Sequence, residues 1–358
     1  MAYTTIDDAS AYFQTALYTG NGGTISITND GNSDLKPDWV WVKNRTAYQH
    51  QSFDSSRGVH QKIHQSVTNA ESTDTNTLTS FNTDGFSSGS NVGINQNTKA
   101  HVAWQWKANG GTTATNTTGN GIDAVIQASA TSGFSIITYT GNGTQSGHTV
   151  GHGLGAVPKM IISKDRTNSS NVVSWRVYHE AVGNTKYMEL QSHAAQSTFN
   201  DWDNTSPTSS VYSVGGDGGY TPTNTNNATY MAYVFADVQG FSKIGSYVAN
   251  ANADGPMVYT GFKPAWVLRK AITRAEPWML MDSKRSPFNF VKTISDPSSN
   301  AADATTPADY GIDFLANGFK VRTGTTSYGN HTAGNVYIYM AFAEEPLVTS
   351  TGVPATAR

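Results

Sequence analysis

Carboxylates are the residues through which this chain could most readily do chemistry, because glycosidic hydrolysis needs two of them about 5 to 9.5 Å apart. Only six glutamates are present: Glu71, Glu180, Glu189, Glu276, Glu344 and Glu345. Asp54 and Asp282 stand in matching Asp-Ser-x-Arg segments, where a turn or an ion pair with the arginine is the simpler explanation. No cysteine is present, which excludes thiolate nucleophiles, thiolate metal sites and disulfides. We therefore expect no catalytic residues and no enzyme.

Acidic loops are the best candidates for metal binding. Asp201 and Asp203 lie in the segment NDWDNTS, and Asp254 lies in NADG. Calcium takes six to eight oxygen ligands, and such loops supply several of them. They lack the full pattern of a calcium-binding loop, so ordinary turns stabilised by aspartate side chains remain the alternative. Calcium is thus a candidate ligand, and no other cofactor is expected. Histidines also cluster without zinc spacing, at His50, His60 and His64 and at His148 and His152.

Aromatic side chains in loops could bind a sugar. A pyranose stacks its apolar face on an aromatic ring while nearby amides and hydroxyls bind its own hydroxyls. The loop aromatics are Tyr48, Trp202, Tyr220 and Tyr328. Each could instead simply anchor its loop. The tryptophans on strands, among them Trp39, Trp41 and Trp104, are expected to form the core.

These side chains are carried by a segment that occurs three times. A proline opens an apolar strand in each copy, and a lysine follows six residues later. The pairs are Pro37 and Lys43, Pro158 and Lys164, and Pro264 and Lys270. Ordered around them are an aromatic-to-Tyr segment before a Gly/Asn turn (Phe13–Tyr18, Phe134–Tyr139, Phe241–Tyr247) and a closing strand around Ala103, Ala232 and Ala341. Recurrence of several markers in one order predicts three diverged copies.

Alternation along these segments predicts strands. In the first copy Trp39, Trp41 and Lys43 share one face and Val40 and Val42 the other. Frequent Gly, Asn, Ser and Asp turns favour an all-β fold of three tandem β-sandwich repeats of jelly-roll type. We expect repeats at residues 1–107, 128–238 and 239–346, each with its own core. Residues 108–127 are expected to form a flexible linker and residues 347–358 a C-terminal tail.

Composition and net charge limit the classes of partner that we expect. Charged residues make up 14% of the chain and the net charge is −3, so nothing favours a nucleic-acid partner. No apolar run approaches the roughly 20 residues that cross a bilayer, and membrane insertion is not expected. The N-terminal residues have neither the basic nor the apolar region of a signal peptide. A surface rich in amides and hydroxyls without an export signal suggests assembly inside a cell and release on lysis.

The segments FQTALYTGNGG, KPDWVWVKNR, DSSRG, FNTDGF and VAWQWKA resemble a repeat of structural proteins of tailed phages, particularly marine ones. The second and third copies are similar to the same family in ITYTGNGT, HGLGAVPKMIISKDR and YTGFKPAWV. The third copy departs from the pattern after its lysine, where AITRAEPW replaces the polar step. The resemblance covers essentially the whole chain.

The resemblance implies a protein assembled in the host cytoplasm and exposed on the virion surface, as a capsid decoration or knob or as a tail-associated fibre component. Other capsid or tail proteins would be its partners, and it would be a homo-oligomer or present in many copies. A carbohydrate-binding adhesin or receptor-binding protein, contacting host-surface glycans, is the alternative. A depolymerase of surface polysaccharide is the least favoured, because no repeated pair of carboxylates is present.

Overall fold

The computed structural model describes residues 3–167, 174–305, 310–324 and 328–354. Its strands form three large and three small sheets, and all the named strand pairs are antiparallel. The all-β sandwich class predicted from the sequence is therefore confirmed. Each large sheet and its small sheet are here called a unit.

The first unit opens with a short 3-10 helix, η1 (Ala9–Ala11), and contains one further helical turn, α1 (Val92–Asn95). Its strands are β1 (Phe13–Thr19), β2 (Ile25–Ile27), β3 (Trp39–Asn44), β4 (Gln51–Asp54), β5 (Gln61–His64), β6 (Ser72–Thr73), β7 (Leu78–Phe81), β8 (Phe86–Ser88) and β9 (Ala100–Trp106). The large sheet has the order β1-β9-β3-β4-β5-β6, and the small sheet has the order β2-β8-β7.

The second unit is built in the same way, with two extra strands at one edge. Its strands are β10 (Ala114–Asn116), β11 (Ala124–Ser129), β12 (Phe134–Thr140), β13 (His148–Gly151), β14 (Met160–Asp165), β15 (Arg176–His179), β16 (Lys186–Glu189), β17 (Ser197–Thr198), β18 (Val211–Val214) and β19 (Thr229–Phe235). The large sheet has the order β10-β11-β12-β19-β14-β15-β16-β17, and β13 pairs with β18.

The third unit has the smallest large sheet. Its strands are β20 (Ser242–Val248), β21 (Met257–Tyr259), β22 (Phe262–Ala271), β23 (Met279–Asp282), β24 (Ile312–Leu315), β25 (Gly318–Val321) and β26 (Val336–Pro346). The large sheet has the order β20-β26-β22-β23, and the small sheet has the order β21-β25-β24. The same four-strand order thus occurs as β1-β9-β3-β4, as β12-β19-β14-β15 and as β20-β26-β22-β23.

The proline-led strands occupy the same place in these three sheets. Lys43 pairs with Val102 of the closing strand, Lys164 with Met231 and Lys270 with Ile338. In each sheet the residue two after the proline pairs with the closing strand, and the lysine follows four residues later on the same ladder. All three lysines therefore occupy the same rung. Their side chains therefore point to equivalent faces of the three sheets.

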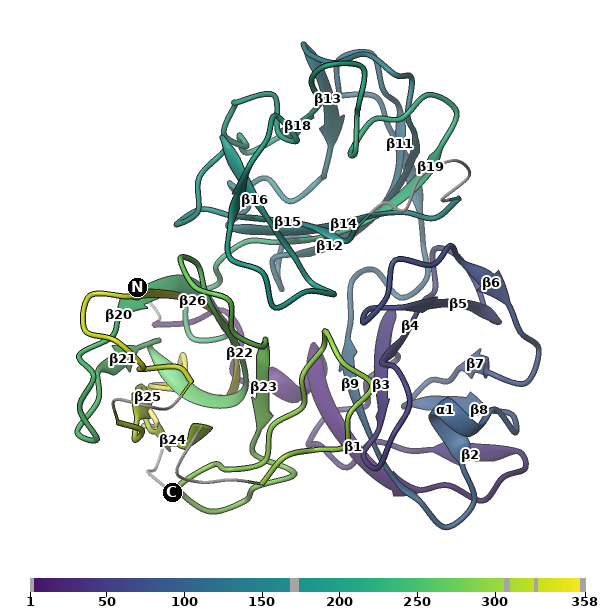
Figure 1. Ribbon diagram of the computed structural model, residues 1–358. Helices are drawn as coiled ribbons and strands as arrows, with labels where there is room; N and C mark the ends of the chain where they lie inside the picture. The colour runs from purple at the N-terminus through teal and green to yellow at the C-terminus, as the bar shows by residue number, and fades with distance from the viewer. Residues whose placement is uncertain (1–2, 168–173, 306–309, 325–327, 355–358) are drawn as a thin grey trace.

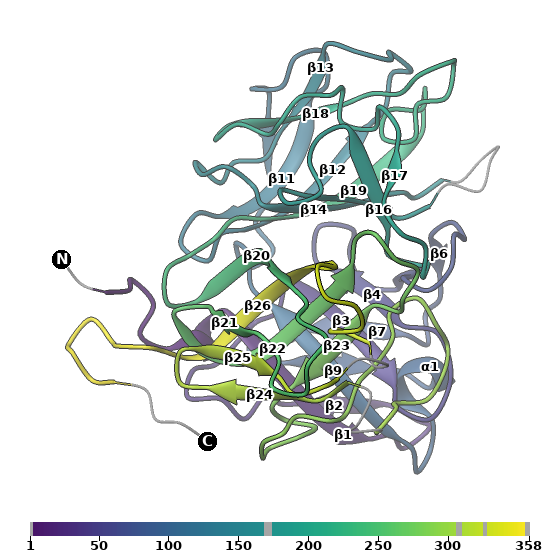
Figure 2. The ribbon, with the colours of Figure 1, turned by 60° about the vertical axis from the view of Figure 1, so that its left-hand side comes forward.

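The three large sheets face one another around the middle of the molecule, and the small sheets lie on the outside (Figure 1). In a second view the large sheet of the second unit still lies across the other two units (Figure 2). Alternation explains this arrangement, because Trp39 and Trp41 project from β3 into the middle while Val40 and Val42 pack against the small sheet.

A single hydrophobic cluster joins all three units, so the expectation of three separate cores is only partly right. Large aromatic rings on the inner faces are in contact across the units. Ring centroids are 4.1 Å apart for Trp39 and Tyr233, 5.5 Å for Trp106 and Trp266, and 5.3 Å for Phe13 and Phe342. Trp39, Trp41 and Trp104 are buried as predicted, with at most 1% of each residue exposed.

Residues 108–127 do not form the expected flexible linker. They contain β10 and the beginning of β11, which pair with each other and extend the large sheet of the second unit through β12. The Gly- and Thr-rich composition suggested a loop, but this segment pairs its backbone at the edge of the large sheet, where exposed polar residues are tolerated.

Candidate functional site: the junctions between units and the adjoining cleft

The three units close into a ring, because the same backbone contact is made at every junction. At each junction a loop residue of one unit donates its backbone N–H to a carbonyl of the next unit. The acceptor is the residue directly after the proline-led strand. The donors and acceptors are Glu71 and Arg166 at 2.9 Å, Gln196 and Ile272 at 2.8 Å, and Asp303 and Arg45 at 2.9 Å. The first unit binds the second, the second the third, and the third the first.

A second contact runs in the opposite direction. In two units a tryptophan immediately precedes the strand that follows the proline-led strand, namely β15 or β23. Its indole N–H donates to a carbonyl of the preceding unit. Trp175 donates to His64 and Trp278 to Glu189, each at 2.9 Å. His50 takes this place in the first unit. Burial and the charges of Lys43 and Arg285 lower the pKa of His50 well below its ordinary value, and the backbone carbonyl of Asp296 opposes that shift.

A third contact lies deeper in each junction. Asp54 accepts a hydrogen bond from the Tyr233 hydroxyl of the second unit at 2.9 Å. Asp282 accepts one from the indole N–H of Trp104 of the first unit at 3.0 Å. The equivalent residue of the second unit is a histidine, and His179 Nε2 lies 3.4 Å from the Tyr339 carbonyl of the third unit.

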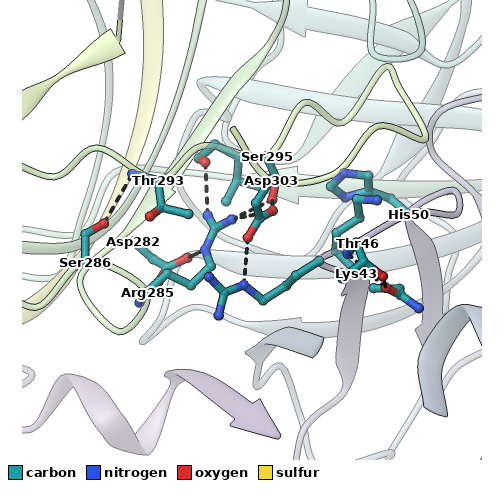
Figure 3. Close-up of polar contacts among 12 residues, drawn as sticks. Lys43, Thr46, His50, Asp282, Arg285, Ser286, Thr293, Ser295 and Asp303 are labelled. Atoms are coloured by element: carbon teal, nitrogen blue, oxygen red, sulfur yellow. Dashed lines mark hydrogen bonds and ion pairs between the residues drawn. The ribbon is translucent and has the colours of Figure 1, made fainter. Parts of the chain in front are cut away.

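Buried ion pairs reinforce two of the three junctions. Arg285 binds Asp282 at 2.6 Å and Asp303 at 3.1 Å, and Arg45 of the first unit binds Asp303 at 2.7 Å. Figure 3 shows Arg285 between Asp282, Ser295 and Asp303. Burial acts to raise the pKa of Asp303, but the charge of Arg285 and hydrogen bonds from Ser295 and Arg45 hold it below its usual value. The carboxylate is therefore the ionised bridge between two units.

The junction between the first and second units repeats this network with other residues. Arg57 binds Asp54 at 2.6 Å and Glu71 at 2.5 Å, and Arg166 of the second unit binds Glu71 at 2.6 Å. Burial acts to raise the pKa of Glu71, but Arg166 and Arg57 outweigh it and the pKa lies below its usual value.

The junction between the second and third units has neutral residues at these places. Val182 stands where the other units have an arginine, and Gln196 and Ile272 stand where they have the carboxylate and the second arginine. The ring is thus held by the same backbone geometry with two different sets of side chains.

The three equivalent lysines are buried, and Lys43 and Lys270 each contact a carbonyl of a neighbouring unit. Lys43 donates to the carbonyls of Ala47 at 2.9 Å and Tyr48 at 2.7 Å, and Lys270 donates to the His193 carbonyl of the second unit at 3.0 Å. Burial lowers the pKa of each lysine to about 8. At most 1% of each residue is exposed, so a solvent-borne substrate cannot reach the amines.

A pair of asparagines holds the Gly/Asn turn of each unit, a feature that the repeat markers did not reveal. A buried asparagine donates its side-chain amide to the side chain of the turn asparagine, which returns its backbone N–H. The pairs are Asn95 with Asn21, Asn224 with Asn142 and Asn330 with Asn250, with amide contacts of 2.8 to 3.0 Å. We call these pairs the asparagine clamps.

A polar cleft of about 330 Å³ opens where the third unit meets the first. It is lined by acidic, amide and hydroxyl side chains around an apolar floor that includes Phe13 and Ala343. Lys284 of the third unit crosses its edge to Asp30 of the first at 2.8 Å. The Thr15 hydroxyl is buried at its wall and has no hydrogen-bond partner among the described residues.

The family described as a domain of unknown function, DUF7483, matches residues 8–346. The chain belongs to the DUF7483 family. No curated protein and no solved structure matches the chain significantly.

The DUF7483 match runs from the turn before β1 to the last residue of β26 as one segment. The match therefore covers all three units of this chain. In the part of this DUF7483 chain that the structure describes, no helix is long and apolar enough to cross a membrane.

The predicted sugar-stacking residues of the DUF7483 chain are distributed over all three units, with Tyr48 in the first, Trp202 and Tyr220 in the second and Tyr328 in the third. Tyr48 and Tyr328 are exposed at 37% and 36%, and Tyr328 stacks on Tyr310. Tyr220 is half-buried against Phe199. Trp202 was a wrong prediction, because its ring is buried and its indole N–H donates to the Lys186 carbonyl at 3.1 Å. The polar segment around Trp202 suggested an exposed loop, but the ring itself fills the outer core of the second unit.

The predicted calcium-binding aspartates already have partners. Asp201 is buried beside Arg176, with Nε and Oδ2 3.5 Å apart, and burial raises its pKa to about 6. Asp203 accepts a hydrogen bond from the Gly147 N–H at 2.7 Å. Asp254 is exposed and pairs with Lys320 at 2.8 Å. Among the described residues, no three His, Cys, Asp or Glu side chains gather as a metal site would require. The histidine clusters predicted from the sequence therefore form no such group.

Proposed function

We propose that the chain is a non-enzymatic structural protein of a tailed phage, exposed on the particle surface as a capsid decoration or a tail-associated fibre component. The observation that carries the proposal is the closed ring. Three units share one aromatic core, and every junction repeats the same backbone hydrogen bond. A particle component must keep its shape outside the cell, and redundant buried junctions provide that persistence.

Two further features support a structural role. The resemblance to phage structural repeats extends over the whole ring, and the surface is rich in uncharged polar side chains. The equivalent carboxylates Asp54 and Asp282 each form an ion pair with an arginine, at 2.6 Å, within a junction. Carboxylates committed to ion pairs favour a structural role over polysaccharide hydrolysis.

A carbohydrate-binding adhesin or receptor-binding protein is the second candidate, and the cleft between the third and first units favours it. Its hydroxyl, amide and carboxylate groups around an apolar floor are the groups that recognise sugars. The two candidates are compatible, because a surface component of a particle can also contact host glycans.

Labelling of intact particles tests the proposal. Gold-conjugated antibodies against the chain should decorate the heads or tails of the phage that encodes it, and a density map of the particle should contain the three-lobed ring. Its absence from purified particles would refute the structural role. Release of reducing sugars from host polysaccharide by the pure chain would refute the non-enzymatic part.

A further inference from the structure

The third unit carries a loop that the other two lack. Ladder pairing aligns Ser52, Val177 and Leu280, and each pairs with a residue on the next strand or segment. Eleven positions separate Ser52 from its partner Ile63 and Val177 from its partner Met188. Fifteen separate Leu280 from Ser295, so the third unit has four additional residues.

The additional residues fall after Arg285, because that arginine makes the same contact with Asp282 as Arg57 makes with Asp54. They place Phe288 in solvent, with 81% of the residue exposed, and Phe290 with 42% exposed. Phe288 is the most exposed large hydrophobic residue of the described chain. Single exposed apolar residues are common, but here two aromatic residues are exposed together on one insertion.

The loop is held in place on both sides of Phe288. Asn289 exchanges two hydrogen bonds with the backbone of Phe314, at 2.8 and 2.9 Å. Val291 pairs with Ile312, and the Ser286 hydroxyl accepts the Thr293 N–H at 3.2 Å, as Figure 3 shows. An aromatic ring on an anchored loop is presented without a large ordering cost on binding.

The polar cleft begins where this loop leaves the sheet. Ser283, Lys284 and Pro287 line the cleft, and Pro287 also borders the hollow formed by Phe288 and Phe290. Thr15 is a further lining residue of the cleft, and its hydroxyl is buried without a hydrogen-bond partner among the described residues. A ligand seated in the cleft could therefore extend along the loop and stack on its rings.

The chemistry of the lining selects the ligand class. Carboxylate, amide and hydroxyl groups next to an aromatic ring suit the alternating apolar faces and hydroxyl edges of a sugar. The lining contains four acidic side chains and one lysine, so its net negative charge repels uronic and sialic acids. The acidic residues are Asp8, Asp30, Glu344 and Glu345. Two phenylalanines are too small an apolar surface for a stable protein interface, which needs about 800 Å² on each side.

We propose that the insertion carrying Phe288 and Phe290, together with the adjoining cleft, is a binding site for an oligosaccharide that lacks acidic groups. The proposal rests on the proposed function, since it locates the host-glycan contact of a particle-surface protein. It assigns one such site to each chain, because the insertion occurs in one unit.

The test uses the full chain on an array of neutral, amine-bearing and acidic oligosaccharides, with a multivalent display of the same chain in parallel. Phe288→Ala is the test variant, and Val248→Ala, which shortens an exposed apolar side chain elsewhere in the third unit, is the matched control. Unchanged melting temperatures would show that both variants fold. The expected result is binding to oligosaccharides without acidic groups, weakened about tenfold or more by Phe288→Ala and unaffected by Val248→Ala.

Four results would overturn the inference. Glycan binding that survives Phe288→Ala would place the glycan contact elsewhere and leave the proposed function intact. A preference for acidic oligosaccharides would contradict the charge argument. Normal glycan binding by Phe288→Ala together with failure to enter particles would make the loop a contact for another particle protein. Binding of no glycan by either display would remove the glycan contact, while labelling of particles would still decide the structural role.

Discussion

Replacing Arg57 by valine should destabilise the ring strongly, because the side chain at this junction is a buried cation shared by two carboxylates. Neither Arg57 nor Asp54 has an exposed side chain, and Arg57 also donates to the carbonyls of Ser52 and Gln61 at 3.3 and 3.2 Å. The variant leaves Asp54 buried with two hydrogen-bond donors, the Tyr233 hydroxyl and a backbone N–H, but no cation. Removing one partner of a buried ion pair costs about 3 to 5 kcal/mol.

That cost converts into a measurable change in thermal stability. An unfolding entropy of about 2.1 cal/mol/K per residue, applied to the whole ring unfolding as one unit, predicts a melting temperature about 4 to 7 °C lower. Differential scanning calorimetry at neutral pH measures it directly. Lys159→Met is the control, since Lys159 and Glu180 form a half-exposed ion pair whose loss should cost less than about 1 kcal/mol.

The second junction supplies a sharper control. Its neutral residues can be transplanted by combining Asp54→His, Arg57→Val, Glu71→Gln and Arg166→Ile, which removes the two carboxylates and the two arginines together. The combined variant should be more stable than Arg57→Val alone, because no buried charge is left unpaired. Equal melting temperatures for Arg57→Val and Lys159→Met would refute the reasoning. So would a combined variant less stable than the single one.

Three further predictions follow from other parts of the ring. Asn224→Ala should cost about 1 to 3 kcal/mol, because the Thr144 carbonyl and Asn142 lose their donor, and hydrogen exchange should quicken at that turn while an exposed Asn32→Ala control stays unchanged. Trp104→Ala should cost about 3 to 5 kcal/mol and Trp104→Phe less, as measured by urea unfolding; an unchanged midpoint for the alanine variant would mean the ring is not packed. Stability should fall as the pH drops from about 6.5 to 4, because burial lowers the pKa of His64, His101 and His179 to about 4 and the unfolded chain then binds protons first. Each such histidine contributes a slope of about 1.4 kcal/mol per pH unit in this range, and calorimetry that finds no slope there would contradict their burial as neutral groups.

Strand periodicity was a good guide to which face each residue occupies, and a poorer guide to register. The closing-strand markers Ala103 and Ala232 share a rung, but the third unit has Tyr339 there, and Ala341 lies two residues further along. A slip of two residues keeps every side chain on its face, so alternation alone cannot detect it. The spacing from proline to lysine was reliable because both belong to one strand.

The contacts that close the ring could not be read from the sequence. Arg45 and Asp303 are 258 residues apart, and nothing in their local sequence says that they meet. The asparagine clamps were hidden for another reason. Asn95, Asn224 and Asn330 lie in segments with many asparagines, and only the hydrogen bonds single out the buried one in each unit. The exposure of Phe288 could not be predicted, because only the ladder pairing shows that the third unit has four additional residues there.

The closed ring also sets an order of events during synthesis. The first unit leaves the ribosome with its inner face of tryptophans uncovered, and domains fold as they emerge. Its bonds to the third unit cannot form until Asp282 and Asp303 have been made, more than two hundred residues after Trp39. For that interval the nascent chain displays an apolar surface that only its own later part can cover. Slower translation of the third unit would therefore lengthen the period in which the chain is prone to aggregate or needs a chaperone.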